Sequence, residues 1–181
     1  MGPSQLMDRP TSTFDSASSD AEVIIILSET AARTQALGAK LGRAMRVGDV
    51  VGLTGPLGSG KTTFTQGIAV GLEVARDRHV ASPTFALVNE HPGRVPLIHA
   101  DFYRVKAPAE IAELGLEEAY DRAAAVLEWA ERFPDVVPQD HLEITLSIEA
   151  GEVRRMVLKA TGSRGRALAA ALAGGADAAA L

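Results

Sequence analysis

The sequence predicts a three-layer α/β fold, in which a mixed, mainly parallel β-sheet lies between helices and ends in an antiparallel C-terminal hairpin. Short β-branched runs alternate along the chain with stretches of helical periodicity, which is typical of α/β proteins. Several of these runs are apolar at every position, as expected of strands that are buried on both faces. The 181 residues suit one domain, because chains usually divide only beyond about 250 residues.

Two strand–helix units fill the first half of the chain. The β-branched run of each unit predicts a strand, and the apolar residues that follow it recur with the spacing of one helix face. A capping-type residue is expected at the first helix start, and a Gly-Asp pair between the units predicts a turn. In order, the expected elements are a strand at Val23–Leu27, a helix begun by Ser28 and Glu29, a turn at Gly48-Asp49, a strand at Val50–Thr54 and a helix at Lys61–Leu72.

The second half of the chain supplies further strands, an interrupted helical stretch and a hairpin. Gly115 interrupts the helical pattern between Pro108 and Tyr120, and two alternating runs flank Gly151, as the strands of an antiparallel hairpin do. The other expected elements are strands at Thr84–Asn89, Val95–Ala100 and Ala124–Glu128, hairpin strands at Glu143–Ile148 and Arg154–Ala160, and a short helix at Arg166–Ala173.

The two ends of the chain differ from the middle in composition. Residues 1–20 are rich in Ser, Thr, Asp and Pro, so burial of apolar side chains cannot offset the entropy lost on ordering them. Residues 174–181 are Gly- and Ala-rich and follow the last expected helix. We therefore expect a disordered leader at 1–20, a single domain at 21–173 and a flexible tail at 174–181.

Composition excludes several classes of protein. Without cysteine the chain cannot form disulfides, cysteine-ligated zinc sites or iron–sulfur clusters. A net charge of −5 argues against a domain that binds nucleic acid mainly by counterion release. The apolar run Val23–Leu27 is far shorter than the roughly 20 residues that span a bilayer, and no targeting signal precedes it. These features favour a cytoplasmic protein with no membrane or DNA partner.

Residues 55–62 read Gly-Pro-Leu-Gly-Ser-Gly-Lys-Thr and match the pattern G-x-x-x-x-G-K-[ST]. An apolar strand is expected directly before the motif and an amphipathic helix directly after it, which is the context of a phosphate-binding loop (P-loop). A Gly-rich turn without a ligand is the alternative, but the complete four-position pattern in this context favours the P-loop. The fold prediction is therefore a P-loop NTPase-like arrangement.

Each residue type in the motif has a chemical reason. Gly58 and Gly60 let the backbone curl closely, so that successive N–H groups can point at phosphate oxygens. Lys61 places a mobile positive charge between the β- and γ-phosphates, and the Thr62 hydroxyl can ligate Mg²⁺. Thr63 either touches the α-phosphate or is an ordinary first-turn residue. A P-loop alone predicts nucleotide binding and does not establish hydrolysis.

Acidic residues end two of the predicted strands. Asp101 and Glu128 are candidates to hold Mg²⁺ directly or through water, with a turn or helix cap as the alternative role. His99 is more often a packed, hydrogen-bonded core residue than a catalytic one. Residues 82–84, Ser-Pro-Thr, occupy the place where P-loop GTPases carry a threonine that senses the γ-phosphate.

An ordered series of motifs, and not the P-loop alone, resembles the TsaE (formerly YjeE) family, the bacterial P-loop ATPases of tRNA threonylcarbamoyladenosine (t6A) biosynthesis. The similarity covers roughly Ile24 to Ala160. The motifs that carry it are residues 29–38 (ETAARTQALG), 55–63 (GPLGSGKTT), 82–88 (SPTFALV), 99–104 (HADFYR), 113–116 (ELGL) and 127–129 (LEW).

The resemblance implies ATP and Mg²⁺ as cofactors and slow ATP hydrolysis that rises with the partner proteins TsaD and TsaB. TsaD transfers the threonylcarbamoyl group to adenosine 37 of tRNA, so tRNA would be reached indirectly through the complex. Carried over by position, the implied site residues are Lys61, Thr84, Asp101 and Glu128 for catalysis, Thr62 and Glu128 for the metal, and Thr34, Gly58, Ser59, Gly60, Lys61, Thr62, Thr63 and Arg155 for the nucleotide.

Two positions qualify the resemblance. On the late hairpin, Arg154 is as plausible a nucleotide contact as Arg155. Pro56 stands where the family usually carries an acidic residue, and proline lacks an N–H donor. No contact from that position is therefore carried over.

Two other functions compete with a partner-stimulated ATPase. A small-molecule or nucleotide kinase would share the P-loop, but the sequence shows no compact lid segment with several arginines. A nucleotide-gated adaptor with little productive hydrolysis would also share it. Turnover measured with and without TsaD and TsaB separates the adaptor from the ATPase.

Overall fold

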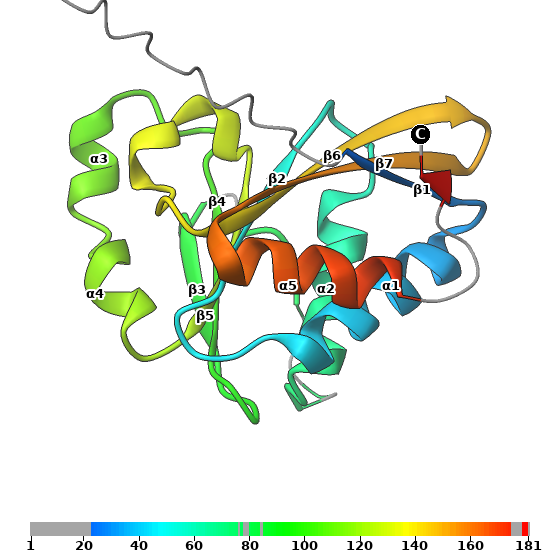
Figure 1. Cartoon of the computed structure of the whole chain (residues 1–181). Coiled ribbons are helices and arrows are strands. Elements are labelled where there is room, and N and C mark those ends of the chain that lie inside the picture. The colour runs from blue at the N-terminus through cyan, green and yellow to red at the C-terminus, as the bar shows by residue number, and fades with distance from the viewer. Residues whose placement is uncertain (1–22, 76, 78–79, 84, 175–178, 181) are drawn as a thin grey trace, which may run out of the picture.

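The computed structural model describes residues 23–75, 77, 80–83, 85–174 and 179–180. The predicted leader at 1–20 and most of the predicted tail at 174–181 lie outside these ranges, as does Thr84. One sheet runs through the described residues, with helices on both of its faces (Figure 1).

The sheet is mixed, with a parallel centre. Its order is β3-β4-β5-β2-β6-β7-β1-β8. The pairs β4–β5, β5–β2 and β2–β6 are parallel, and the remaining pairs are antiparallel. The strands are β1 (Ile24–Ser28), β2 (Val50–Thr54), β3 (Val88–His91), β4 (Leu97–Asp101), β5 (Ala124–Glu128), β6 (His141–Ala150), β7 (Val153–Thr161) and β8 (Ala179–Ala180).

The structure confirms the predicted mixed sheet and the hairpin, which β6 and β7 form. The hairpin does not end the sheet, because β1 pairs with the outer side of β7 and β8 pairs with β1. The parallel part of the sheet is therefore its four central strands, with antiparallel pairs on both sides.

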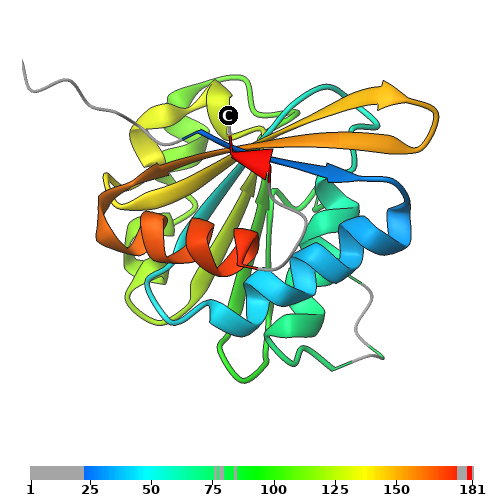
Figure 2. The same cartoon turned by 45° about the vertical axis from the view of Figure 1, so that its right-hand side comes forward.

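Helices cover the two faces of the sheet in separate groups, so the molecule has three layers (Figure 2). The first group packs against one face and consists of α1 (Ala31–Ala44), α2 (Lys61–Gly71) and α5 (Gly162–Ala173). The second group packs against the other face and consists of α3 (Pro108–Ala112), α4 (Leu116–Tyr120) and the 3-10 helices η1 (Ala130–Arg132) and η2 (Pro134–Val136).

Each face of the sheet has its own hydrophobic cluster. Successive side chains of β2 alternate between them: Val51 and Leu53 join the cluster under the first group of helices, and Val50 joins the other. Every residue of β2, β4 and β5 is buried. This double burial is the reason that the central strands read as continuous apolar runs.

Several element boundaries differ from the sequence predictions, including those of α1, β3 and α5. Thr30, not Ser28, caps α1 and accepts a hydrogen bond from the Arg33 N–H at 3.1 Å, while Ser28 is buried. The strand expected at Thr84–Asn89 begins only at Val88, because Leu87 has φ of 63° and donates its N–H to the Pro83 carbonyl in a turn. The last helix begins at Gly162, earlier than expected.

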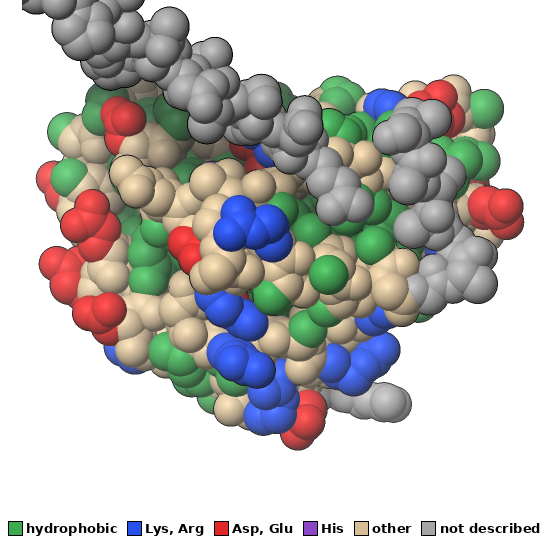
Figure 3. Space-filling model, viewed as in Figure 1, with side chains coloured by type: hydrophobic (Ala, Val, Ile, Leu, Met, Phe, Trp, Pro, Cys, Tyr) green, Lys and Arg blue, Asp and Glu red, His purple; other side chains and the backbone are tan. Residues whose placement is uncertain are grey.

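Charged side chains are unevenly distributed over the surface. Lys and Arg gather over the α1 and α5 side, and Asp and Glu gather over the α3 and α4 side (Figure 3). Some of the basic residues hold α5 in place. Lys40 donates to the carbonyls of Leu172 and Gly174 at the end of α5, and Arg164 forms a two-point ion pair with Asp49. Lys40 and Arg164 therefore have a structural role, because they attach α5 to the rest of the domain.

No helix in the described ranges combines the length and the apolar character needed to cross a membrane.

Asp140 caps the start of α5 from outside the helix. Its carboxylate accepts N–H groups from Ser163, Arg164 and Gly165 at 3.1, 3.2 and 2.8 Å. The hydrogen bond from Gly165 is the main cause that lowers the pKa of Asp140, and those from Arg164 and Ser163 add to it. The charged carboxylate thus stabilises the first turn of a helix that packs on the sheet.

We expect Asp140→Ala to lower the free energy of unfolding by about 1 kcal/mol at pH 7, the usual cost of losing a helix cap. The pKa of Asp140 in the folded protein lies below that of an unfolded aspartate, which is about 3.9. The contribution of Asp140 to stability is therefore complete above pH ~3.9 and is lost as the pH falls through the pKa of the folded state. Urea unfolding of the parent and of Asp140→Ala, at pH 7 and at low pH, measures the difference in the free energy of unfolding and its dependence on pH. Glu152→Gln, on the exposed hairpin turn, is the control for charge. Equal losses in both variants at pH 7 would contradict the capping role.

Candidate nucleotide-binding site

The P-loop connects β2 to α2 at the carboxyl end of the parallel strands. Its glycines adopt positive φ values: 124° at Gly55, 77° at Gly58 and 102° at Gly60. A Cβ at Gly55 would lie 2.0 Å from the carbonyl oxygen of Leu146 on β6, so the loop packs directly against the neighbouring strand. Gly60 precedes α2 without a side-chain cap, which leaves the helix N-terminus open to an anion.

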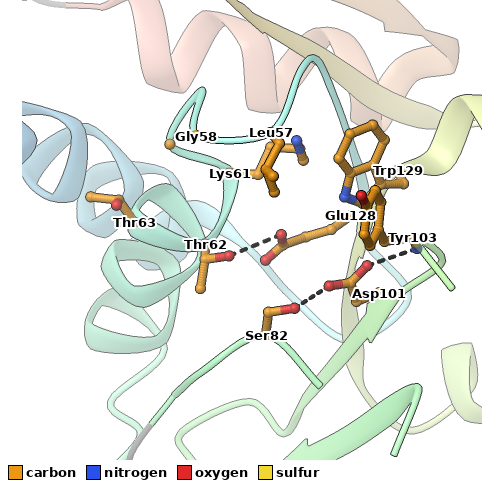
Figure 4. A pocket seen from close by; sticks show the side chains of 11 residues that line it. Leu57, Gly58, Lys61, Thr62, Thr63, Ser82, Asp101, Tyr103, Glu128 and Trp129 are labelled. Carbon is orange, nitrogen blue, oxygen red and sulfur yellow. Dashed lines mark hydrogen bonds between the residues drawn. The ribbon is translucent and has the colours of Figure 1, made fainter. Parts of the chain in front are cut away.

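A cavity of about 360 Å³ lies beside the loop (Figure 4). The P-loop and the start of α2 form one side, and residues at the ends of β4 and β5 form the other. Its lining residues are Leu57, Gly58, Gly60, Lys61, Thr62, Thr63, Ser82, Asp101, Tyr103, Glu128 and Trp129.

Lys61 is buried at the base of the loop. Its Nζ donates to the carbonyls of Gly55 at 2.6 Å and Pro56 at 3.0 Å, and lies 3.9 Å from the ring centroid of Trp129. Burial lowers the pKa of the Lys61 ammonium, and the carboxylates of Glu128, Glu131 and Asp101 act in the opposite direction. A phosphate bound at the loop could therefore replace the two carbonyls as the acceptor of the hydrogen bonds from this ammonium.

Glu128 lies at the centre of a buried polar network. It is 2% exposed, and Thr62 and Thr65 donate their hydroxyls to its two carboxylate oxygens at 3.0 and 3.4 Å. The Nε2 atom of His99 lies 2.8 Å from Oε1. Three neighbours thus fix the orientation of this carboxylate, which a buried charge requires.

Asp101 is level with Glu128, because the parallel register of β4 and β5 pairs these two residues. Its carboxylate accepts the Tyr103 N–H at 2.8 Å and a short hydrogen bond from the Ser82 hydroxyl. Ser82 belongs to the segment that the sequence singled out beside Thr84. The structure therefore connects the start of this segment to the acidic wall of the cavity.

The residues present fit a magnesium ion that is shared with phosphate. The described ranges contain no cluster of three His, Asp or Glu side chains that could hold a metal by themselves. Thr62 and Glu128 nevertheless offer hydroxyl and carboxylate oxygens 3.0 Å apart at the cavity. Mg²⁺ usually binds through one or two protein oxygens together with substrate phosphates and water. This donor set matches that description.

A family model described as "Threonylcarbamoyl adenosine biosynthesis protein TsaE" matches residues 28–157. The chain belongs to the TsaE family. A TsaE protein of Bacillus subtilis is 40% identical over 119 residues, covering 65% of this chain and 73% of the relative. A TsaE protein of Treponema pallidum is 34% identical over 133 residues, covering 73% of this chain and 97% of the relative.

A solved structure agrees with this membership. The crystal structure of Bacillus subtilis YdiB superimposes with a TM-score of 0.69 at 32% identity, over 83% of this chain and 94% of that chain. The fold is thus shared with a known protein.

The structure brings most of the site residues that the TsaE resemblance implied to one cavity. Gly58, Gly60, Lys61, Thr62, Thr63, Asp101 and Glu128 line it. Ser59 is buried in the loop, and its N–H bonds to the Pro56 carbonyl at 3.2 Å. Thr84 lies outside the described residues.

Two further positions lie elsewhere. Thr34 is buried and does not line the cavity, although a Cβ at Gly60 of the loop would lie 4.0 Å from its methyl group. Its hydroxyl lies 2.8 Å from that of Ser28. Arg155 is not among the lining residues and pairs with Glu149 at 3.8 Å. Its neighbour Arg154 reaches the P-loop, with Nη2 3.5 Å from the Gly58 carbonyl. Of the two arginines, the structure places Arg154 beside the loop.

Sequence reasoning missed part of the cavity wall in this TsaE protein. The rings of Tyr103 and Trp129 are in contact, with centroids 5.0 Å apart and planes tilted by 38°, and neither residue was expected in the site. Each follows an acidic strand end closely, Tyr103 by two residues and Trp129 by one. That proximity was the available signal, but it does not reveal which way an aromatic ring points.

We expect Gly55→Ala to destabilise the protein more than Gly58→Ala. Both require a positive φ, but only at Gly55 would the new Cβ meet a backbone carbonyl, since Gly58 has open space around it. Gly58→Ala should cost about 1 kcal/mol in the free energy of unfolding, and Gly55→Ala about 3 kcal/mol or more. Urea denaturation followed by circular dichroism measures both values. Similar losses would show that β6 does not constrain the loop.

Proposed function

We propose that this TsaE protein is a Mg²⁺-dependent subunit that binds and hydrolyses ATP and is required for the threonylcarbamoyl modification of adenosine 37 of tRNA, acting with TsaD and TsaB. The observation that carries the proposal is the cavity itself, in which the P-loop and the start of α2 face Asp101 and Glu128. The relatives are named as t6A biosynthesis proteins, and these names support a role in that pathway. A cytoplasmic location belongs to the proposal, because the proposed pathway uses ATP and tRNA.

The P-loop residues have the chemistry to bind a triphosphate. Main-chain N–H groups of the loop and of the open N-terminus of α2 would donate to phosphate oxygens, and Lys61 would turn its ammonium from the Gly55 and Pro56 carbonyls to the phosphates. Bound at Thr62 and Glu128, Mg²⁺ would supply charge neutralisation for the terminal phosphates. His99 and Thr65 keep the Glu128 carboxylate in place for this role.

Asp101 is the residue that we assign to the γ-phosphate end. Ser82 and the Tyr103 N–H donate to its carboxylate, which is held as an oriented acceptor at the cavity. An oriented carboxylate can accept a hydrogen bond from an attacking water and so position it in line with the phosphate. Thr84 is our candidate for the residue that senses the γ-phosphate two positions beyond Ser82.

No arginine lines the described part of the cavity, and Arg154 touches the loop from its hairpin side. In related phosphoryl-transfer reactions, a charge supplied in trans contributes about 10³–10⁵ in rate. This supports slow hydrolysis by the isolated chain and acceleration by its partners. A small-molecule kinase has no comparable support, since the relatives carry t6A names and the P-loop is common to both functions.

We expect Glu128→Gln to lower ATP hydrolysis by about 10–100-fold and to raise the Mg²⁺ concentration needed for half-maximal turnover, because the change keeps the shape but removes a charge at the metal. Nucleotide binding titrated with and without Mg²⁺ gives a second readout, in which the variant should lose most of the enhancement by Mg²⁺. Glu131→Gln is the control, since Glu131 also acts electrostatically on Lys61 but does not line the cavity. Equal Mg²⁺ dependence in the parent and Glu128→Gln would contradict the metal assignment.

Lys61→Ala should abolish productive ATP binding while the fold persists, as judged by calorimetry and circular dichroism.

We expect purified TsaD and TsaB to accelerate ATP turnover by the chain, and Thr84→Ala to reduce the stimulated rate far more than nucleotide affinity. An isolated chain that hydrolyses ATP as fast as the mixture would contradict partner stimulation. ATP-dependent complex formation without any turnover would instead indicate a nucleotide-gated adaptor.

A further inference from the structure

Arg132 lies outside the cavity and holds the loop that carries part of its wall. The side chain projects from η1, directly after Glu128 and Trp129, to the loop at residues 102–107 between β4 and α3. It donates from Nη1 to the Phe102 carbonyl at 2.9 Å and to the Tyr103 carbonyl in a short hydrogen bond, and from Nη2 to the Val105 carbonyl at 3.0 Å.

Only a guanidinium suits this arrangement. Its donors lie in a rigid plane, so one side chain can bind three carbonyls of an irregular loop at the same time. A lysine ammonium is a point charge on a flexible stem and cannot reproduce that geometry. Within the loop Phe102 and Val105 are buried, whereas Tyr103 between them is 44% exposed.

The loop held by Arg132 determines two features of the cavity. The Tyr103 N–H donates to the Asp101 carboxylate at 2.8 Å, and the Tyr103 ring packs against the ring of Trp129 (Figure 4). The ring of Trp129 in turn lies 3.9 Å from the Lys61 ammonium. A displacement of Tyr103 would therefore reach both Asp101 and the aromatic side of Lys61.

The backbone at Trp129 directs Arg132 toward this loop. Trp129 has φ of 62°, an unusual value for a bulky side chain, and the chain turns sharply there from β5 into η1. The Arg132 N–H bonds to the Trp129 carbonyl at 3.1 Å, and the Phe102 N–H bonds to the Glu128 carbonyl at 3.0 Å. The ends of β4 and β5 are thus fastened to each other by main chain and by Arg132.

We propose that Arg132 is a positioning residue of the nucleotide site, which acts through Tyr103 to set the Asp101 carboxylate and the Tyr103–Trp129 wall. Arg132 contacts no phosphate in this role. The turnover part of the proposal rests on the ATPase function proposed above, whereas the effect on Trp129 does not.

The test is a double-mutant cycle between Arg132 and Tyr103. The variants are Arg132→Gln, Tyr103→Ala and their combination, with Arg122→Gln as the control, because Arg122 is exposed and pairs with Glu90 away from the cavity. The readouts are partner-stimulated turnover, nucleotide affinity by calorimetry and the emission of Trp129, which is the only tryptophan in the sequence.

We expect Arg132→Gln to lower kcat by about 10–100-fold while nucleotide affinity changes by less than about threefold, because the loss concerns orientation at the reacting end. Trp129 emission should shift to longer wavelength in Arg132→Gln and in Tyr103→Ala. The combined variant should match Tyr103→Ala in emission, because Arg132 reaches Trp129 through the Tyr103 ring. Its kcat should fall below that of Tyr103→Ala, because the main-chain N–H of residue 103, which orients Asp101, remains in Tyr103→Ala and still depends on Arg132. Arg122→Gln should match the parent.

Additive effects on emission in the combined variant, or parent-like emission and kcat in Arg132→Gln, would overturn the proposal. If Arg132→Gln does not fold, the same cycle is made with Arg132→Lys, which keeps the charge but not the fork. If the parent shows no ATP turnover, the proposed function fails, and the coupling of Arg132 to Tyr103 is then decided by emission alone.

Discussion

The parallel, in-register pairing of β4, β5 and β2 is the constraint on which the site depends. Because the carboxyl ends of parallel strands meet at one edge, Asp101 pairs with Glu128, and Glu128 pairs with Leu53 of β2, two residues before the P-loop. The pairing of the strands therefore brings the acidic wall and the phosphate loop face to face. Double burial of these strands makes a slip in register costly, since it would exchange the side chains that pack on the two helix layers.

The same edge has to accommodate charge inside a buried environment. Glu128 and Lys61 are both buried, and an unpaired charge there would be strongly unfavourable. Thr62, Thr65 and His99 satisfy Glu128, while two loop carbonyls satisfy Lys61. These hydrogen bonds pre-orient the groups that a magnesium nucleotide would contact, so less ordering is left to be done on binding. The rings of Tyr103 and Trp129 form a further wall of the cavity. Arg132 connects the chain after β5 to the loop after β4 by side-chain hydrogen bonds outside the sheet.

Local sequence pattern predicted the central elements well, for identifiable reasons. Val50–Thr54 and Ala124–Glu128 were predicted with the boundaries that the structure has, because strands buried on both faces are apolar throughout. The start of α1 was predicted at the wrong residue, since Ser28 and Thr30 are both capping types and only Ser28 becomes buried against Thr34. The start of β3 was predicted four residues too far toward the N-terminus, because the sequence of residues 85–87 gives no sign of the positive φ of Leu87.

The sequence by itself determined the phosphate loop and the two acidic strand ends, because a glycine-rich loop between strand and helix is a local motif with local chemistry. Tertiary structure decided which other side chains join them. On the hairpin, adjacent residues of a strand point to opposite faces, so only the pairing of β6 with β7 could place Arg154 at the loop and direct Arg155 to Glu149. Tyr103 likewise meets Trp129 and Arg132 from a separate part of the sequence, the loop after β4. These contacts exist only once the parallel strands have brought that loop next to η1.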